Sequence, residues 1–183
     1  MLKMAVVLTV CCGATVAMVT GASQSAIDSA QEAQLRKLFP SAAAFAPKGG
    51  EPPHFKAFAV ETGGSKQVLA GLAFLTTELA PLERGYDGPI KVLVGMDSKG
   101  VLTGIIVTEH NEPYGNFSID LPRFPEQFRG KSLRDPFRVG ADIHAVSRAT
   151  MTVSSAARAV RNSARRVARQ LLTPPPVASP AGY

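Results

Sequence analysis

Residues 90–108 read IKVLVGMDSKGVLTGIIVT and carry the strongest structural pattern of the chain. Two runs rich in Val, Ile and Leu, at 90–96 and 101–108, flank the segment Asp97-Ser98-Lys99-Gly100. Apolar, β-branched runs on either side of a short turn segment with glycine predict a β-hairpin. This hairpin decides the fold class, because strands joined by tight turns are antiparallel.

A second hairpin is expected before it. Residues 55–60 (FKAFAV) alternate as a half-buried strand does, Gly63-Gly64 supplies a turn, and residues 68–75 form a second apolar run. The segment Lys48–Pro53 (KGGEPP) is rich in glycine and proline and is predicted to be a loop.

Helices are expected at both ends of these hairpins. Residues 25–39 place apolar side chains near helical spacing and are followed by Pro40. A longer helix is predicted to begin near Val153 or Ser154. Its apolar stripe comprises Val153, Ala157, Val160, Ala164, Val167 and Leu171. The order of elements predicts an α+β fold, with an antiparallel sheet built from hairpins and packed with N- and C-terminal helices.

Two further segments have distinct compositions. Residues 109–140 hold four prolines and are predicted to be irregular, and long irregular segments in compact domains are often functional. Residues 173–183 begin with Thr-Pro-Pro-Pro and are expected to be a disordered, proline-rich tail.

The first residues indicate export. Lys3 precedes an apolar run over 4–19, and Thr20-Gly21-Ala22 supplies small residues where a signal peptidase could cut. Residues 1–22 are therefore predicted to be a signal peptide or an uncleaved membrane anchor. Both alternatives place the body of the protein in an extracytoplasmic, periplasmic location, either soluble or anchored. Both cysteines lie within this run, so the rest of the chain has none.

The chain has a net charge of +6, but the excess is local. Five arginines lie within 158–169, on the last predicted helix. Their simplest role is to keep one helix face solvated, and contact with acidic lipids or a redox partner is the alternative. No nucleic-acid partner is expected, because the protein is predicted to be exported.

A hydroxyl-rich segment, Ser147–Thr152 (SRATMT), stands directly before the last helix. Helix N-termini present unpaired N–H groups and attract anions, so a phosphate group could bind here. The alternative is that Thr152 or Ser154 merely caps the helix.

Ser147-Arg148-Ala149-Thr150 resembles the Ser-Gly-Ala-Thr flavinylation motif of FMN-binding domains. These domains occur in the G subunit of Rnf complexes and in the C subunit of the sodium-pumping NADH:quinone oxidoreductase. Residues 85–97 (GYDGPIKVLVGMD) are similar to the family's entry into its central hairpin. Residues 110–115 (HNEPYG) stand where the family has a loop beside the isoalloxazine, and 35–40 (LRKLFP) resemble its opening helix.

The resemblance implies an FMN-binding domain over residues 27–172, with FMN attached covalently through a phosphoester to Thr150. The cofactor-binding residues that it implies are Thr150, Ser147, Arg148, Ala149, Thr152, Glu112, His110 and Gly115. It further implies an electron-transfer flavoprotein, a carrier rather than an enzyme with its own substrate, and no catalytic residue is assigned. The expected partners are a flavin transferase for maturation and membrane or periplasmic redox proteins.

The arginine-rich last helix and Arg148 in the motif most resemble the flavin domain of NosR/NirI-type denitrification proteins. One position departs from the motif: six residues before Thr150 the family has aspartate, and here His144 stands, with Asp142 two residues earlier. The sequence leaves two alternatives open: the flavin transferase accepts this variant, or attachment of FMN is inefficient or absent.

Other interpretations remain open from the sequence. A metal site at His110 and Glu112 is not expected, because two ligands fall short of the usual three or four. The same loop could be a solvated turn around Pro113. Aromatic residues of the irregular segment, Tyr114, Phe117 and Phe124, could stack on a flavin or anchor the segment to the core. The alternative function is a cofactor-free sensory or regulatory module linked to a respiratory system of the denitrification type.

Overall fold

The computed structural model describes residues 27–61, 64 and 66–172. The predicted signal peptide or anchor, the predicted proline-rich tail and Gly63 of the predicted turn lie outside these residues. Within the described residues, no helix is both long and apolar enough to cross a membrane.

The centre of the fold is a five-stranded antiparallel sheet in which each strand pairs with its neighbours in sequence. Its strands are β1 (Ala44–Gly49), β2 (His54–Val60), β3 (Gln67–Leu75), β4 (Lys91–Asp97) and β5 (Leu102–Glu109). The two predicted hairpins are β2–β3 and β4–β5, and Val94 pairs with Ile105 in the second. The predicted α+β class, with an antiparallel sheet and flanking helices, is confirmed.

Strand β1 is a correction to the sequence prediction, which placed Lys48 and Gly49 in a loop. β1 pairs with β2 at Phe45 and Ala57, and its ladder is irregular between Ala46 and Gly49. The segment lacks β-branched residues and contains Pro47, so its sequence carries little strand signal. An edge strand tolerates proline because one side of its backbone needs no partner.

The first helix, α1 (Ser29–Leu38), begins four residues later than the predicted Ser25. Asp28 sets the start, because its carboxylate accepts the N–H of Gln31 at 2.7 Å as an N-cap. A short helix, α2 (Thr76–Leu79), follows β3 and was not predicted.

The last helix, α4 (Thr150–Val167), begins at Thr150, so the predicted start at Val153 or Ser154 is wrong. The predicted caps Thr152 and Ser154 are wrong for the same reason: the N-cap is Ala149, without a side-chain hydrogen bond. Thr152 lacks that role because its hydroxyl is used elsewhere in the fold. A π-helical turn, η2 (Ala168–Leu172), continues α4.

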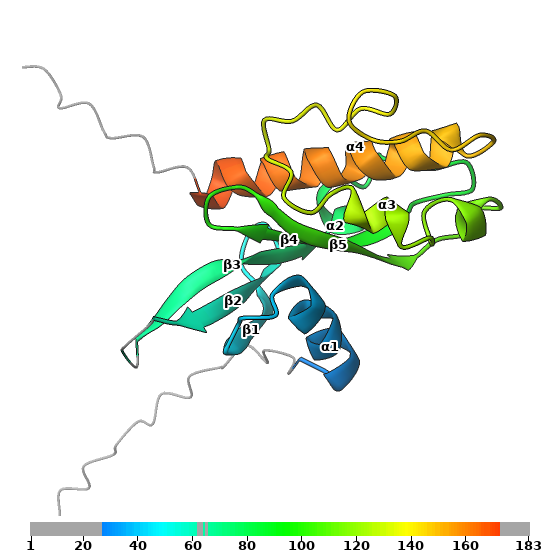
Figure 1. Cartoon of the computed structure of the whole chain (residues 1–183). Coiled ribbons are helices and arrows are strands. Elements are labelled where there is room, and N and C mark those ends of the chain that lie inside the picture. Colours follow the sequence, from blue (N-terminus) through cyan, green and yellow to red (C-terminus); the bar gives the residue numbers. More distant parts are fainter. Residues whose placement is uncertain (1–26, 62–63, 65, 173–183) are drawn as a thin grey trace, which may run out of the picture.

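Helices α1 and α4 lie on opposite faces of the sheet (Figure 1). Each face is covered by its own cluster of buried side chains. Along β4 the buried residues alternate: Val92 and Val94 pack with α4, and Leu93 packs with α1. This period of two is the pattern of a strand covered on both faces. The predicted stripe is confirmed for Val153, Ala157, Val160, Ala164 and Val167, which are fully buried. Leu171, its last predicted member, lies in η2 and is half-buried.

The segment between β5 and α4 is largely irregular, as predicted, and lies beside α4 (Figure 1). It contains a 3-10 turn, η1 (Gly115–Phe117), and one turn of helix, α3 (Arg123–Glu126). Its aromatic side chains Phe124, Phe128 and Phe137 form consecutive ring contacts in the core. The segment is therefore anchored along its length rather than loosely attached.

The arginines of α4 do more than keep a helix face solvated. Arg165 donates to the carbonyls of Leu133 and Asp135 at 3.0 and 2.9 Å, and Arg166 donates to the carbonyl of Leu79 at 3.0 Å. Side chains that satisfy loop carbonyls fasten the loops to the helix. The prediction of a solvated face is accurate only for the more exposed Arg158 and Arg169.

Candidate functional site

Thr150 is the first residue of α4 and is exposed. The hydrogen-bond ladder of the helix begins when the N–H of Val153 bonds to the carbonyl of Ala149 at 2.9 Å. The N–H groups of residues 150–152 therefore have no carbonyl acceptor within the helix, and no side chain caps them. The Thr150 hydroxyl makes one long bond, 3.5 Å, to the carbonyl of Val146. An accessible hydroxyl thus lies at the positive end of an 18-residue helix.

Arg148 has a φ of +68°, in the left-handed region that favours glycine. The motif that this segment resembles has glycine at this position. The turn that places Thr150 at the helix entrance therefore requires a left-handed residue at 148, and arginine adopts it here. The turn is closed by the N–H of Ala149, which bonds to the carbonyl of Val146 at 3.0 Å.

Glu112 joins three segments under the start of α4. Its carboxylate accepts the hydroxyl of Thr152 and the N–H groups of Tyr86 and Asp87, the last two at 3.1 and 2.9 Å. Glu112 and Thr152 are 6% and 2% exposed. Gly85 is required beside them, because a Cβ there would overlap the Glu112 carboxylate.

Burial raises the pKa of Glu112. This effect is outweighed by the lowering of the pKa that comes from the hydrogen bonds of Thr152, Asp87 and Tyr86 and from the attraction of His110. The net pKa is below the usual range of a glutamate. The buried side chain is therefore an anion whose charge is held by directed N–H and O–H donors.

His110 extends this network. Its Nδ1 accepts the N–H of Glu112 at 3.0 Å, so the proton of a neutral ring lies on Nε2, which donates to Asp120 at 2.8 Å. Gly115 packs against the ring, and a Cβ at Gly115 would overlap it. The 110–115 loop is thus a brace between β5 and η1, held by Glu112, His110 and Gly115. Its turn residues Pro113 and Tyr114 are exposed, so the alternative of a solvated turn holds for these two residues. Asp120 was not singled out from the sequence, because a lone exposed carboxylate carries no pattern.

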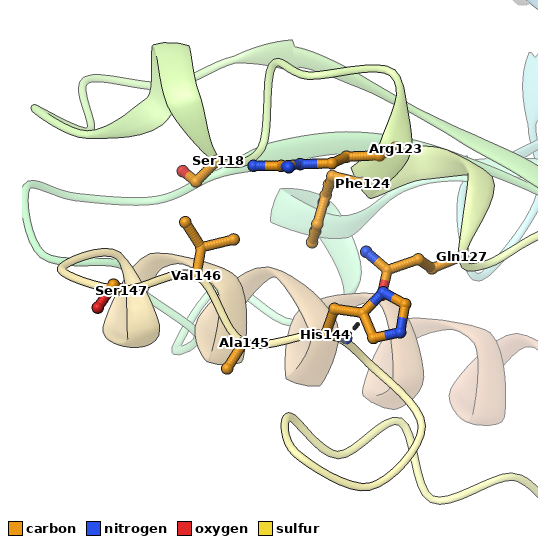
Figure 2. Close-up of a pocket in the computed structure, with 8 residues that line it drawn as sticks. All are labelled: Ser118, Arg123, Phe124, Gln127, His144, Ala145, Val146 and Ser147. Carbon is orange, nitrogen blue, oxygen red and sulfur yellow. Dashed lines mark hydrogen bonds between the residues drawn. The ribbon is translucent and has the colours of Figure 1, made fainter.

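A cavity of about 550 Å³ opens beside the entrance of α4 (Figure 2). Arg123 and Ser118 lie on one wall, and Val146 and Ser147 lie across from them (Figure 2). His144 lies beside Gln127, whose side-chain oxygen accepts the N–H of His144 at 2.6 Å. The full lining is Ser118, Arg123, Phe124, Gln127, His144, Ala145, Val146 and Ser147.

The cavity and the predicted site residues overlap only in part. Ser147 lines the cavity, while Glu112, His110 and Gly115 belong to the brace under α4 and are absent from its lining. Sequence reasoning missed Arg123 and Gln127. Both residues lie in the proline-rich segment 109–140, which the sequence predicted to be functional. The sequence did not indicate which side chains of that segment would line the cavity.

Asp142 lies near the position of the motif's aspartate, but its carboxylate is bound to the 131–138 segment. Its carboxylate accepts the N–H groups of Arg138 and Phe137 at 2.6 and 3.1 Å and pairs with Lys131 at 3.0 Å. Burial raises the pKa of Asp142, but these partners outweigh it and hold that pKa below its usual range. His144 stands at the motif position itself and is exposed at the cavity.

The aromatic candidates separate into two groups. Tyr114 and Phe117 are partly exposed and contact each other with ring centroids 5.4 Å apart. Phe124 is buried, belongs to the core, and also lines the cavity. Among the described residues, no three His, Cys, Asp or Glu side chains gather as a metal site.

Comparison with known proteins shows what this part of the chain is similar to. The family model of the FMN-binding domain matches residues 85–165, from the Glu112-bonded loop through most of α4. The chain is also similar to the G subunit of the ion-translocating oxidoreductase complex of Aliivibrio fischeri (strain MJ11), 38% identical over 52 residues. That alignment covers 27% of this chain and 25% of the relative, so it spans about a quarter of either protein. The region matched by the family model contains the motif turn, the brace and the entrance of α4, so this part of the chain is similar to FMN-binding domains.

Proposed function

We propose that this chain is an extracytoplasmic electron-transfer flavoprotein with FMN attached through a phosphoester to Thr150. The observation that carries the proposal is the accessible Thr150 hydroxyl at the uncapped N-terminus of α4, beside a cavity of about 550 Å³.

The residues present fit a phosphoester. The first N–H groups of α4 have no partner within the helix, and a phosphate on Thr150 would lie near them and near the positive end of the dipole. The neighbouring Arg148 is exposed and adds a positive charge. A bond forms between the Thr150 oxygen and the phosphorus of the flavin nucleotide, and the bond from that phosphorus to its leaving-group oxygen breaks. The proton of the hydroxyl departs with the leaving group. The product is the protein plus one FMN less one water.

The residues also fit a flavin ring. Pockets for cofactors of this size are clefts of about 300–1,000 Å³ with apolar walls and a few polar groups. The cavity combines Phe124 and Val146 with the polar ends of Arg123, Gln127 and His144. Thr150 does not line the cavity, but its hydroxyl bonds to the carbonyl of Val146, which does, so a cofactor attached at Thr150 would be tethered beside the cavity.

FMN would supply reversible electron storage, while the protein sets its orientation and its electrostatic surroundings. The Glu112 brace fixes the entrance of α4 through Thr152, so the attachment residue two positions earlier is held in place. The Arg123 guanidinium at the cavity wall would favour negative charge on a bound ring.

Covalent attachment suits export. A dissociable flavin would be lost by dilution outside the cytoplasm, whereas a phosphoester retains it. The apolar run of residues 4–19 supports export. A flavin transferase is the maturation partner, and the name of the relative supports a membrane redox complex as the electron partner. The arginine-rich last helix supports a relationship to NosR/NirI-type proteins.

We further propose that the domain extends over 27–172, beyond the matched 85–165. Strand β3 pairs with β4 from Gly71 to Leu75, and α1 covers Leu93 of β4. A chain that began at residue 85 would therefore expose an apolar face of β4 and an unpaired strand edge.

The test is co-production of the full chain with a flavin transferase. Wild type should gain one FMN less one water by intact mass, and the denatured protein should fluoresce in a gel. Thr150→Ala should remove both signals, whereas Thr152→Ala leaves the modified hydroxyl in place and should lower the yield without removing them. An unmodified wild type, under conditions that flavinylate a control domain, would overturn the proposal and favour the cofactor-free sensory module.

A further inference from the structure

A second cavity, of about 220 Å³, lies between the loop after Asp135 and the outer face of α4. It shares no lining residue with the cavity beside Ser147. Its lining comprises Phe137, Arg138, Val139, Ser154, Arg158 and Arg161. The lining thus contains three arginines and no acidic residue.

Two elements bring these arginines together. Ser154, Arg158 and Arg161 follow one another at helical spacing on α4, and Arg138 faces them from the loop. Like charges gathered around one small cavity repel each other unless an anion lies between them.

The guanidinium groups are only partly neutralised within the described chain. Arg158 pairs with Glu83 at 3.0 Å. Arg161 bonds to neutral acceptors, the side chain of Asn162 and the carbonyl of Pro136. For the Arg138 side chain, no hydrogen bond or ion pair is found among the residues that the structure describes. The cavity therefore retains donors and positive charge for a ligand.

The loop that carries Arg138 is fixed in an unusual conformation. Phe137 is 2% exposed and has a φ of +49°, in the left-handed region that a bulky residue rarely adopts. The Asp142 carboxylate holds this corner through the N–H groups of Phe137 and Arg138. Backbone strain of this kind persists where the surroundings enforce it and is frequent at ligand sites.

We propose that this cavity binds the phosphate group of an anionic ligand. Arg138, Arg158 and Arg161 supply planar donors that match phosphate oxygens, and Ser154 supplies a hydroxyl. The cavity is smaller than the usual range for whole cofactors, so a single anionic group is the fitting size. A free phosphate or phosphomonoester and the headgroup of an anionic phospholipid share this chemistry. The site does not depend on the attachment of FMN.

The test is calorimetric titration of the full chain with inorganic phosphate at constant ionic strength. Arg138→Gln is the main variant, because the Arg138 side chain holds no other part of the described fold. We expect its phosphate affinity to fall about tenfold or more, as for the loss of a charge-assisted contact. Arg169→Gln removes the same charge from η2, outside the cavity, and should bind as wild type does. Thr150→Ala should also bind, which separates this site from the flavin.

A second variant keeps the arginine contacts of the fold. Ser154→Asp places a carboxylate in the cavity and should abolish phosphate binding by supplying an internal counter-charge. Absence of saturable phosphate binding by wild type would overturn the proposal. Equal binding by wild type, Arg138→Gln and Ser154→Asp would also overturn it.

A parallel experiment separates the two sources of phosphate. The chain is sedimented with vesicles of phosphatidylglycerol in phosphatidylcholine, and with phosphatidylcholine alone. If the ligand is the lipid headgroup, the chain should sediment with the vesicles that contain phosphatidylglycerol. This sedimentation should be lost in Arg138→Gln and reversed by inorganic phosphate. Phosphate binding without such sedimentation would identify a free phosphate group.

Discussion

The hydroxyl of Thr152 donates to the buried carboxylate of Glu112, forty residues earlier in the chain. This contact ties the first turn of α4 to the 110–115 loop, and two N–H groups of the 85–87 segment complete the shell of the carboxylate. It makes the position of Thr150, the proposed attachment residue, depend on a side chain that does not line the cavity.

Glu112→Gln should destabilise the protein by about 1–3 kcal/mol, because an amide cannot accept from all three donors and leaves buried polar groups unsatisfied. Thr152→Val removes one donor and should cost less than Glu112→Gln. Urea unfolding followed by circular dichroism measures both. The double variant should lose less than the sum, since the two residues share one contact. Additive losses would contradict the coupling.

The low pKa values of Glu112 and Asp142 predict a loss of stability in acid. A carboxyl whose folded pKa is depressed stabilises the fold above its unfolded pKa, about 4, and this contribution is lost as pH falls through the folded pKa. The free energy of unfolding should therefore decrease as the pH falls from about 5 to about 3, a window set by the unfolded carboxyl pKa. The slope should flatten in Asp142→Asn but not in Glu126→Gln, a carboxyl on α3. An unchanged slope in Asp142→Asn would contradict the assignment.

Gly85→Ala should destabilise the protein by on the order of 2 kcal/mol, because the new Cβ overlaps the Glu112 carboxylate, which is fixed by its three donors. Gly49→Ala is the matched control, since a Cβ there meets nothing within 4 Å. It should leave the thermal midpoint nearly unchanged. Comparable losses in the two variants would show that backbone freedom, rather than the close approach, decides the effect.

The hairpins and the stripe of α4 were predictable from the sequence because local periodicity encodes them. The α4 start was not, because Thr150–Thr152 is hydroxyl-rich and typical of a cap, while the decisive contact of Thr152 comes from Glu112. The motif resemblance located Thr150 and Ser147. It did not reveal Arg123 and Gln127, whose approach to Ser147 results from tertiary packing of an irregular segment.

Arg148→Gly should stabilise the protein, because glycine adopts the φ of +68° without the Cβ conflict that arginine bears. The gain should be about 1 kcal/mol or less, since glycine also gains conformational freedom in the unfolded chain. Ser147→Gly, whose φ is not positive, should lower stability instead. The comparison uses thermal unfolding of both variants. Destabilisation by Arg148→Gly would mean that the arginine side chain makes a stabilising contact that outweighs the strain.

His144→Asp tests the departure from the flavinylation motif. His144 lies at the cavity six residues before Thr150, where the family has aspartate, and its backbone is held by Gln127. Because the side chain is exposed, replacing it should leave the fold unchanged. We expect the fraction of chains that carry FMN to rise when the transferase recognises a carboxylate at this position. His144→Asn is the control, since it has nearly the same shape as aspartate without the charge, and it should not exceed wild type. The measurement is the ratio of modified to unmodified intact mass after timed co-production with the transferase. Equal fractions in wild type and His144→Asp, both below saturation, would show that the charge at this position does not control attachment.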